Sequence, residues 1–162
     1  MGLTVMVGSI CTIILVFFIA SPWICPSLWG SYSLGKNLYM VVDEHSFQKG
    51  TERCQGYMIL QGSQMEGRVC HGGSYIIPMG YENRYDSMGE IREHVLESRY
   101  NDDWIIVKTY IVKKDRYQYY FIKLDFDEKI SADEIISKHV QMYSDSISFI
   151  DACKKHHVDL EF

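Results

Sequence analysis

Apolar residues form one unbroken run near the start of the chain and then alternate with polar residues over most of the remaining length. Residues 3–20, LTVMVGSICTIILVFFIA, carry no charge, and the first charged residue of the chain is Lys36. A bilayer core needs about 20 apolar residues in a helix, so this run predicts a transmembrane helix. Pro22 is expected to end it, and Trp29 suits the headgroup layer beyond it.

The sequence leaves four interpretations of this segment open. An uncleaved single-pass anchor is favoured because apolar side chains cover every face of the helix. A cleaved secretory signal lacks a basic n-region, and Phe18 stands where its cleavage site needs a small residue. A lipoprotein signal ending at Cys25 lacks the small residue expected at Ile24. The fourth interpretation is a buried helix of a soluble protein. We expect the domain that follows this segment to lie outside the cytoplasm.

Alternation with a period of two predicts an antiparallel meander of about six strands after the anchor. The clearest part is a hairpin of residues 91–100 and 103–112, because Asn101-Asp102 tolerates the positive φ values of a tight turn. Residues 104–107 are apolar on both faces and predict a central strand. The remaining strands are expected at 37–42, 56–60, 72–78 and 117–126, with loops at 43–52 and 79–90.

The predicted domain core comes from the last two strands of this meander. Trp104, Ile106 and Ile122 are expected to lie in it. Tyr120 and Leu124 share a face with Ile122 because side chains two positions apart point the same way in a strand. Phe126 continues that face.

The apolar period changes to that of a helix after residue 130. Ser131 and Glu134 form a capping box, and Ile130 and Ile135 occupy the hydrophobic-staple positions. Apolar residues then recur at helical spacing as far as Tyr143. Ser144-Asp145-Ser146 is expected to cap a second helix, whose apolar stripe is Phe149, Ile150 and Cys153.

These patterns together predict an α+β fold. It consists of an N-terminal transmembrane helix, an antiparallel β meander of about six strands and two C-terminal helices packed on the sheet. We expect residues 1–30 to be a membrane anchor or signal segment and residues 31–162 to form a single globular domain.

Charge restricts the partners of this domain. The chain has 16 Lys and Arg against 21 Asp and Glu, a net charge of −5. A mildly acidic domain lacks the basic footprint that binds phosphate backbones, so nucleic acid is not an expected partner. The lipid bilayer is the expected partner, and another envelope protein is a further candidate.

Five cysteines offer one candidate disulfide. Cys54 and Cys70 flank a predicted strand, and in an oxidising compartment they can close a loop of about 15 residues worth roughly 3 kcal/mol. The alternative is that both are ordinary thiols. Cys153 and His156 lie three residues apart in a predicted helix, but a metal site needs three or four converging ligands, which favours a solvated helix end.

No catalytic, phosphate-binding or dinucleotide motif occurs in the sequence. We therefore expect no enzyme activity, no cofactor and no metal. The candidate interaction site is the predicted loop after residue 79, whose residues are expected to be exposed. It contains Tyr81, Asn83, Arg84, Tyr85 and Asp86, of which Tyr81, Arg84 and Tyr85 are the candidate contact residues.

Four segments carry a resemblance to a known group of proteins: LGKNLY at 34–39, YIIP at 75–78, YNDDWIIVK at 100–108, and YQYYF at 117–121. With them the chain resembles small uncharacterised exported or membrane-anchored proteins of Bacteroides-type bacteria. The resemblance implies a cell-envelope location and a rough fold, and it implies no activity and no site residues.

Two functions fit these observations. The first is a membrane-tethered accessory or protein-interaction domain without catalysis, acting through the sheet face or the 81–86 loop. The alternative is a small ligand-binding or enzymatic domain of unrecognised type at the cell envelope. A flat tyrosine-rich surface favours the first, and a pocket lined by histidines and carboxylates favours the second.

Overall fold

A computed structural model of the chain describes residues 32–49, 51–62, 73–79 and 84–162. The expected anchor at residues 3–20 lies outside these ranges. Within them, no helix is both long enough and apolar enough to cross a membrane.

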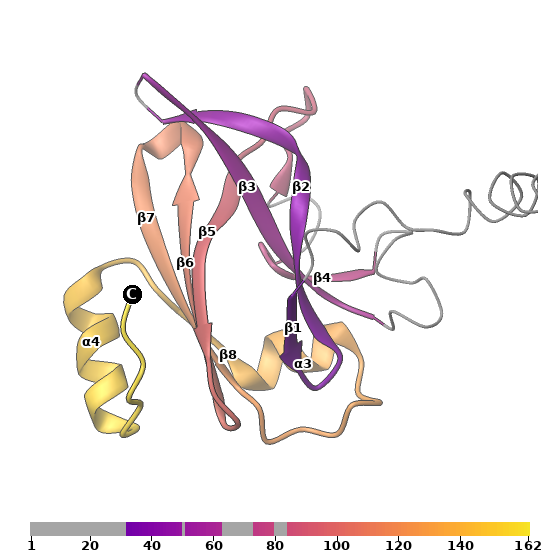
Figure 1. Cartoon of the computed structure of the whole chain (residues 1–162), viewed down its shortest axis with the longest axis vertical. Coiled ribbons are helices and arrows are strands. Elements are labelled where there is room, and N and C mark those ends of the chain that lie inside the picture. Colours follow the sequence, from indigo (N-terminus) through magenta and orange to yellow (C-terminus); the bar gives the residue numbers. More distant parts are fainter. Residues whose placement is uncertain (1–31, 50, 63–72, 80–83) are drawn as a thin grey trace, which may run out of the picture.

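The described residues form one antiparallel sheet of eight strands, two α-helices and a short 3-10 helix. The strands follow the order β1-β2-β3-β5-β6-β7-β8, and β4 pairs with β3 beside this path. The elements are β1 (Tyr32–Gly35), β2 (Leu38–Lys49), β3 (Glu52–Gln61), β4 (Ser74–Ile77), β5 (Glu93–Tyr100), β6 (Trp104–Ile111), η3 (Val112–Lys114), β7 (Arg116–Lys123), α3 (Ala132–His139), β8 (Val140–Tyr143) and α4 (Ser146–Lys155). In Figure 1 the sheet is strongly curved, α3 lies across its lower end, and α4 lies outside β7.

The larger of the cores fills the inner side of the curved sheet. It contains residues of β1 to β7 together with Ile135 of α3, which is fully buried. The prediction that Tyr120 and Ile122 share a buried strand face is confirmed. The predicted strand at 117–126 is too long, since β7 ends at Lys123, but Leu124 and Phe126 beyond it also belong to this core.

A second core lies on the opposite face of β6 and β7, where α4 covers the sheet. Ile106 and Phe121 contribute from the strands, and Phe149 and Cys153 contribute from the helix. The prediction that β6 is apolar on both faces is confirmed, since Ile105 belongs to the inner core and its neighbour Ile106 to the outer one. The predicted core residue Trp104 is half-buried at the outer core.

The predicted central hairpin is confirmed as β5 and β6. Its turn is held by the Asn101 side chain, whose Oδ1 accepts hydrogen bonds from the backbone N–H groups of Asp103 at 3.0 Å and Trp104 at 2.8 Å. The connection after β6 is the helix η3, and Asp115 follows it with a positive φ of 45°. Each of the two turns therefore contains an Asn or Asp residue, the residue types that favour tight turns.

The prediction of a loop over residues 43–52 is wrong. Strand β2 continues to Lys49, and β3 already begins at Glu52, so the two strands form a long ribbon. A register shift between Val42 and Ser46 interrupts their pairing without ending it. Lys49 and Glu52 have opposite charges and face each other at the end of the ladder. Such a cross-strand pair stabilises strand pairing in a segment with few apolar residues.

The predicted helix at residues 131–143 is too long. Helix α3 ends at His139, and Val140 adopts extended φ and ψ angles of −101° and 126°. Residues 140–143 instead form β8, which pairs with β7 from Tyr119 to Ile122. This pairing satisfies backbone groups that β7 would otherwise expose at a sheet edge. With β1, which the sequence also did not indicate, it raises the strand number above the predicted six.

Candidate functional site

A cavity of about 760 Å3 lies between α4, the outer face of β6 and β7, and residues 157–162, which we call the C-terminal segment. We call this space the α4 cavity. Binding sites for small molecules have volumes of roughly 300–1,000 Å3, so the α4 cavity falls within that range. Its lining consists of Lys108, Tyr119, Ser146, Phe149, Ile150, Cys153, Lys154, His157, Val158, Asp159, Leu160, Glu161 and Phe162.

Helix α4 forms one wall, and of its predicted apolar stripe Phe149 and Cys153 face the sheet whereas Ile150 does not. Asp145 caps the helix, and its carboxylate accepts a hydrogen bond of 2.8 Å from the backbone N–H of Ser148. Phe149 and Cys153 lie four residues apart and are both buried against β6 and β7. Ile150 comes directly after Phe149 and stays 48% exposed at the edge of the cavity.

The C-terminal segment forms the opposite wall. His157 has a positive φ of 54°, and the N–H of Val158 donates to the Cys153 carbonyl at 2.9 Å, so the chain reverses at the end of α4. Figure 1 shows the segment running back beside the helix. Val158 and Leu160 pack against the outer core, which holds the segment to the body of the domain.

Aromatic rings form much of the cavity floor. Tyr119 and Phe149 stack with ring centroids 5.1 Å apart and an interplanar angle of 22°. Phe162 of the C-terminal segment stacks on Phe149 at 5.7 Å and 25°. Such offset stacks add to the gain from burial and give the floor a fixed shape. The floor therefore suits a flat apolar group.

Charged side chains surround this apolar floor. Lys108 on β6 is half-buried, and its Nζ lies 4.8 Å from the ring centroid of Tyr117. Lys154, Asp159 and Glu161 are exposed at the rim. Within the described part of the chain, none of the four charged groups takes part in an ion pair. They are available to a ligand.

A second group of polar side chains lies in the inner core. Glu93 Oε1 accepts hydrogen bonds from the Thr109 hydroxyl at 2.5 Å and the Tyr120 hydroxyl at 2.8 Å. Burial raises the pKa of the Glu93 carboxyl, although these two hydrogen bonds oppose the shift. Gln118 completes the cluster by donating to the Tyr120 hydroxyl at 2.8 Å. The cluster is buried and takes no part in lining the α4 cavity.

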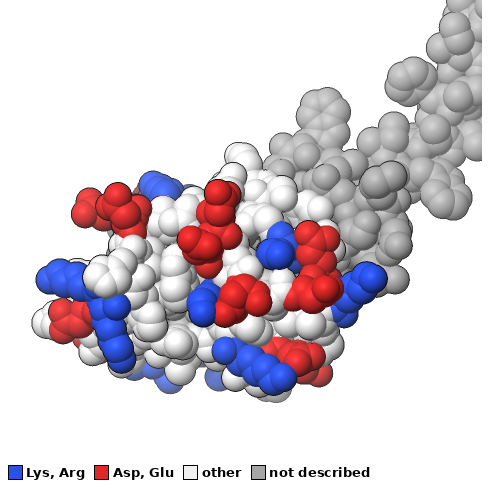
Figure 2. Space-filling view, turned by 90° about the horizontal axis from the view of Figure 1, so that it is seen from below, with Lys and Arg blue, Asp and Glu red and all other residues white. Residues whose placement is uncertain are grey.

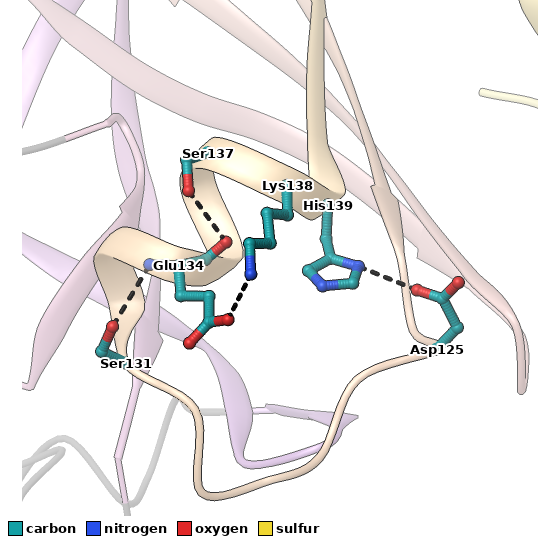
Figure 3. A network of polar contacts seen from close by, with 6 residues as sticks. All are labelled: Asp125, Ser131, Glu134, Ser137, Lys138 and His139. Carbon is teal, nitrogen blue, oxygen red and sulfur yellow. Dashed lines mark hydrogen bonds and ion pairs between the residues drawn. The ribbon is translucent and has the colours of Figure 1, made fainter.

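A histidine–carboxylate pair joins α3 to the end of β7 (Figure 3). His139 Nδ1 and Asp125 Oδ1 are 2.8 Å apart. The hydrogen bond from Lys123 is the main cause that lowers the pKa of Asp125, and His139 adds to it. The nearby Ser137 hydroxyl donates instead to the Glu134 carbonyl at 3.2 Å and points away from the ring, so these residues do not form a serine triad.

The sequence-predicted interaction loop is described only from Arg84 onward, and Tyr81 lies outside the described residues. The expectation that Arg84 is exposed is wrong, since only 2% of it is accessible. Its guanidinium carbon lies 5.4 Å from the ring centroid of Tyr75 and 5.0 Å from that of Tyr85. Arginine stacks readily on aromatic faces, which explains its burial here. A contact role for Tyr85, which is half-buried, stays a prediction.

Cys54 is half-buried, and its expected disulfide partner Cys70 lies outside the described residues, so their pairing stays a prediction. Cys153 is buried beside Phe149, and burial raises the pKa of its thiol. Over the ranges that the structure describes, no three His, Cys, Asp or Glu side chains gather as metal ligands.

Sequence reasoning missed the α4 cavity because its walls come from segments far apart in the chain. One signal was present: residues 158–162, VDLEF, alternate apolar and polar residues after the second helix. Such alternation indicates an extended segment with one buried face. In the structure the burial alternates in this way, since Val158 and Leu160 are half-buried and Asp159 and Glu161 are exposed.

Charge on the surface is mixed. The face in Figure 2 carries acidic and basic side chains interspersed, with no broad area of a single sign.

Comparison with models of protein families, with curated proteins and with solved structures finds no match for this chain. The function is therefore inferred from the geometry of the site, and the resemblance to Bacteroides-type exported proteins stays a prediction.

Proposed function

We propose that the chain is a membrane-tethered domain that binds a small molecule with an apolar ring system in the α4 cavity. The observation that supports this proposal is the cavity itself, about 760 Å3 in volume with an aromatic floor and a polar rim. Small-molecule sites combine apolar walls with a few polar groups in this way.

The apolar run at residues 3–20 supports the tether. Binding at a tethered domain takes place close to the bilayer surface. The polar residues around the cavity fit a role in orienting a ligand, whereas the Glu93 cluster and the Asp125–His139 pair lie away from its walls. Binding without catalysis is therefore the function that this arrangement supports best.

Two isoleucines of α4 provide a matched test. Ile150 lines the cavity and is 48% exposed, whereas Ile147 is 73% exposed and does not line it. A carboxylate at position 150 places charge beside the apolar floor, which disfavours an apolar ligand. Ile150→Asp should therefore weaken binding of neutral 2-naphthamide at least tenfold, while Ile147→Asp should leave it unchanged.

The measurement is a ligand-observed NMR titration of the full chain in phosphatidylcholine nanodiscs, with empty nanodiscs as the blank. Saturable binding that only Ile150→Asp weakens is the expected result. Absence of saturable binding, or equal loss in both variants, would contradict the proposed function.

A further inference from the structure

The position of Lys108 indicates which chemical class of ligand suits the α4 cavity. Of the described residues that line the cavity, it is the charged one that is half-buried in the floor. It lies on β6 directly opposite Tyr119 of β7, and its Nζ lies 4.8 Å from the ring centroid of Tyr117, two residues along β7 from the aromatic stack. No carboxylate of the described ranges forms an ion pair with its Nζ.

The acidic residues that line the cavity are more exposed than Lys108. Along the C-terminal segment, Val158 and Leu160 are half-buried and pack on the outer core, whereas Asp159 and Glu161 are exposed. These two carboxylates line the cavity from its exposed rim. Among these charged residues, Lys108 is therefore the one that a ligand buried in the cavity meets.

We propose that the α4 cavity selects an aromatic carboxylic acid. Its carboxylate would accept a charge-assisted hydrogen bond from Lys108 Nζ, and its ring would lie against the rings of Tyr119 and Phe162, which are more exposed than Phe149. Hydrogen bonds between charged groups are stronger than neutral ones, and low exposure of the floor strengthens them further. This inference rests on the proposed function, because it names the ligand class of the same cavity.

Three probes with the same ring system test the ligand class: 2-naphthoate, 2-naphthamide and 2-naphthylmethylamine. They carry a negative charge, no charge and a positive charge. Titrated into the full chain in phosphatidylcholine nanodiscs, 2-naphthoate should bind about tenfold more tightly than the amide, and the amine should bind most weakly. Equal affinities for the three probes would overturn the ligand class and leave the proposed function standing, whereas absence of binding by all three would overturn both.

Lys108 variants test the residue. Lys108→Gln should reduce the affinity for 2-naphthoate to that for 2-naphthamide and leave the amide unchanged, and Lys108→Arg should retain most of the preference. Lys114→Gln removes the same charge at an exposed position outside the cavity and should change nothing. Amide binding by Lys108→Gln also shows that the variant is folded. An undiminished preference for 2-naphthoate in Lys108→Gln would overturn the role of Lys108.

Discussion

At the scale of the residue, a glycine on β3 makes room for a buried histidine on the neighbouring strand β5. Gly56 lies on β3, and His94 lies on β5 with its ring fully buried. A Cβ atom built at Gly56 would overlap the His94 ring at Nδ1, Cγ and Cε1. The absence of a side chain at Gly56 therefore makes room for the histidine, and no other amino acid fits there without movement.

Gly56→Ala should destabilise the domain by about 1–3 kcal/mol, because overpacking in a closed core forces neighbours to shift. Urea denaturation of the full chain measures the loss. The double variant Gly56→Ala/His94→Ala removes both partners of the overlap, so its loss should be smaller than the sum of the two single losses. Strict additivity would show that the two residues do not compete for space.

Glu93 should make stability depend on pH. Burial raises its pKa in the folded protein, so the native state holds this proton more tightly than the unfolded chain does. The resulting stability is fully present below the ordinary carboxyl pKa of about 4 and is lost as pH rises through the raised value. Glu93→Gln cannot titrate and should lose less stability over that interval.

Urea melts of the full chain at several pH values from about 4 upward test this expectation. Glu128→Gln, at an exposed position, controls for the loss of one acidic group. If Glu93→Gln and the unmodified protein show the same pH profile, the Glu93 carboxyl does not carry its proton into the native state.

At the scale of elements, helix ends follow the sequence closely. Ser131 is the N-cap of α3, and its hydroxyl oxygen accepts a hydrogen bond of 3.2 Å from the N–H of Glu134 (Figure 3). The Glu134 carboxylate takes a different partner from the one expected in a capping box, since it binds Lys138 Nζ at 2.6 Å. Stabilisation of this terminus therefore comes from the serine.

Ser131→Ala should cost about 0.5–2 kcal/mol of stability, because a helix amide loses its acceptor, and Ser131→Asp should cost much less. Thermal melting of the full chain gives the comparison. Ser137→Ala removes the same hydroxyl from the middle of the same helix and should stay within about 0.5 kcal/mol of the unmodified protein. A larger effect at Ser137 than at Ser131 would contradict the capping role.

Elements with local causes were predictable from the sequence, and elements with distant causes were not. The β5–β6 turn and both helix caps depend on residues within four positions of one another. The change from α3 to β8 at Val140 depends instead on pairing with β7. The α4 cavity likewise depends on the C-terminal segment returning to β6 and β7, so only its alternating pattern was visible in the sequence.

At the scale of the whole molecule, the two faces of β6 and β7 pack against different parts of the domain. Their inner face contributes to the larger core with α3, and their outer face carries α4 and the cavity. A ligand on the outer face therefore lies against strands that the inner core already holds in place. Such support favours a preformed site, because little order is gained on binding.

The proposed tether predicts how the full chain behaves in cells. Residues 3–20 should keep it in membranes after a carbonate wash, and deletion of residues 1–29 should release it to the soluble fraction. Immunoblots of the washed membranes and supernatants distinguish the two forms. Full-length protein recovered in the supernatant would contradict membrane attachment, but it would not contradict ligand binding in the α4 cavity.

The most direct test of the central claim is to locate a bound ligand by NMR of isoleucine methyl groups. The full chain in phosphatidylcholine nanodiscs, labelled at the isoleucine δ1 methyls, is titrated with 2-naphthoate. Ile150 lines the α4 cavity, Ile147 lies on the same helix outside it, and Ile122 lies in the inner core. Saturating shifts that are largest at Ile150 and small at Ile147 and Ile122 are the predicted result. An unchanged Ile150 signal, or shifts centred on the inner core, would contradict a binding site in the α4 cavity.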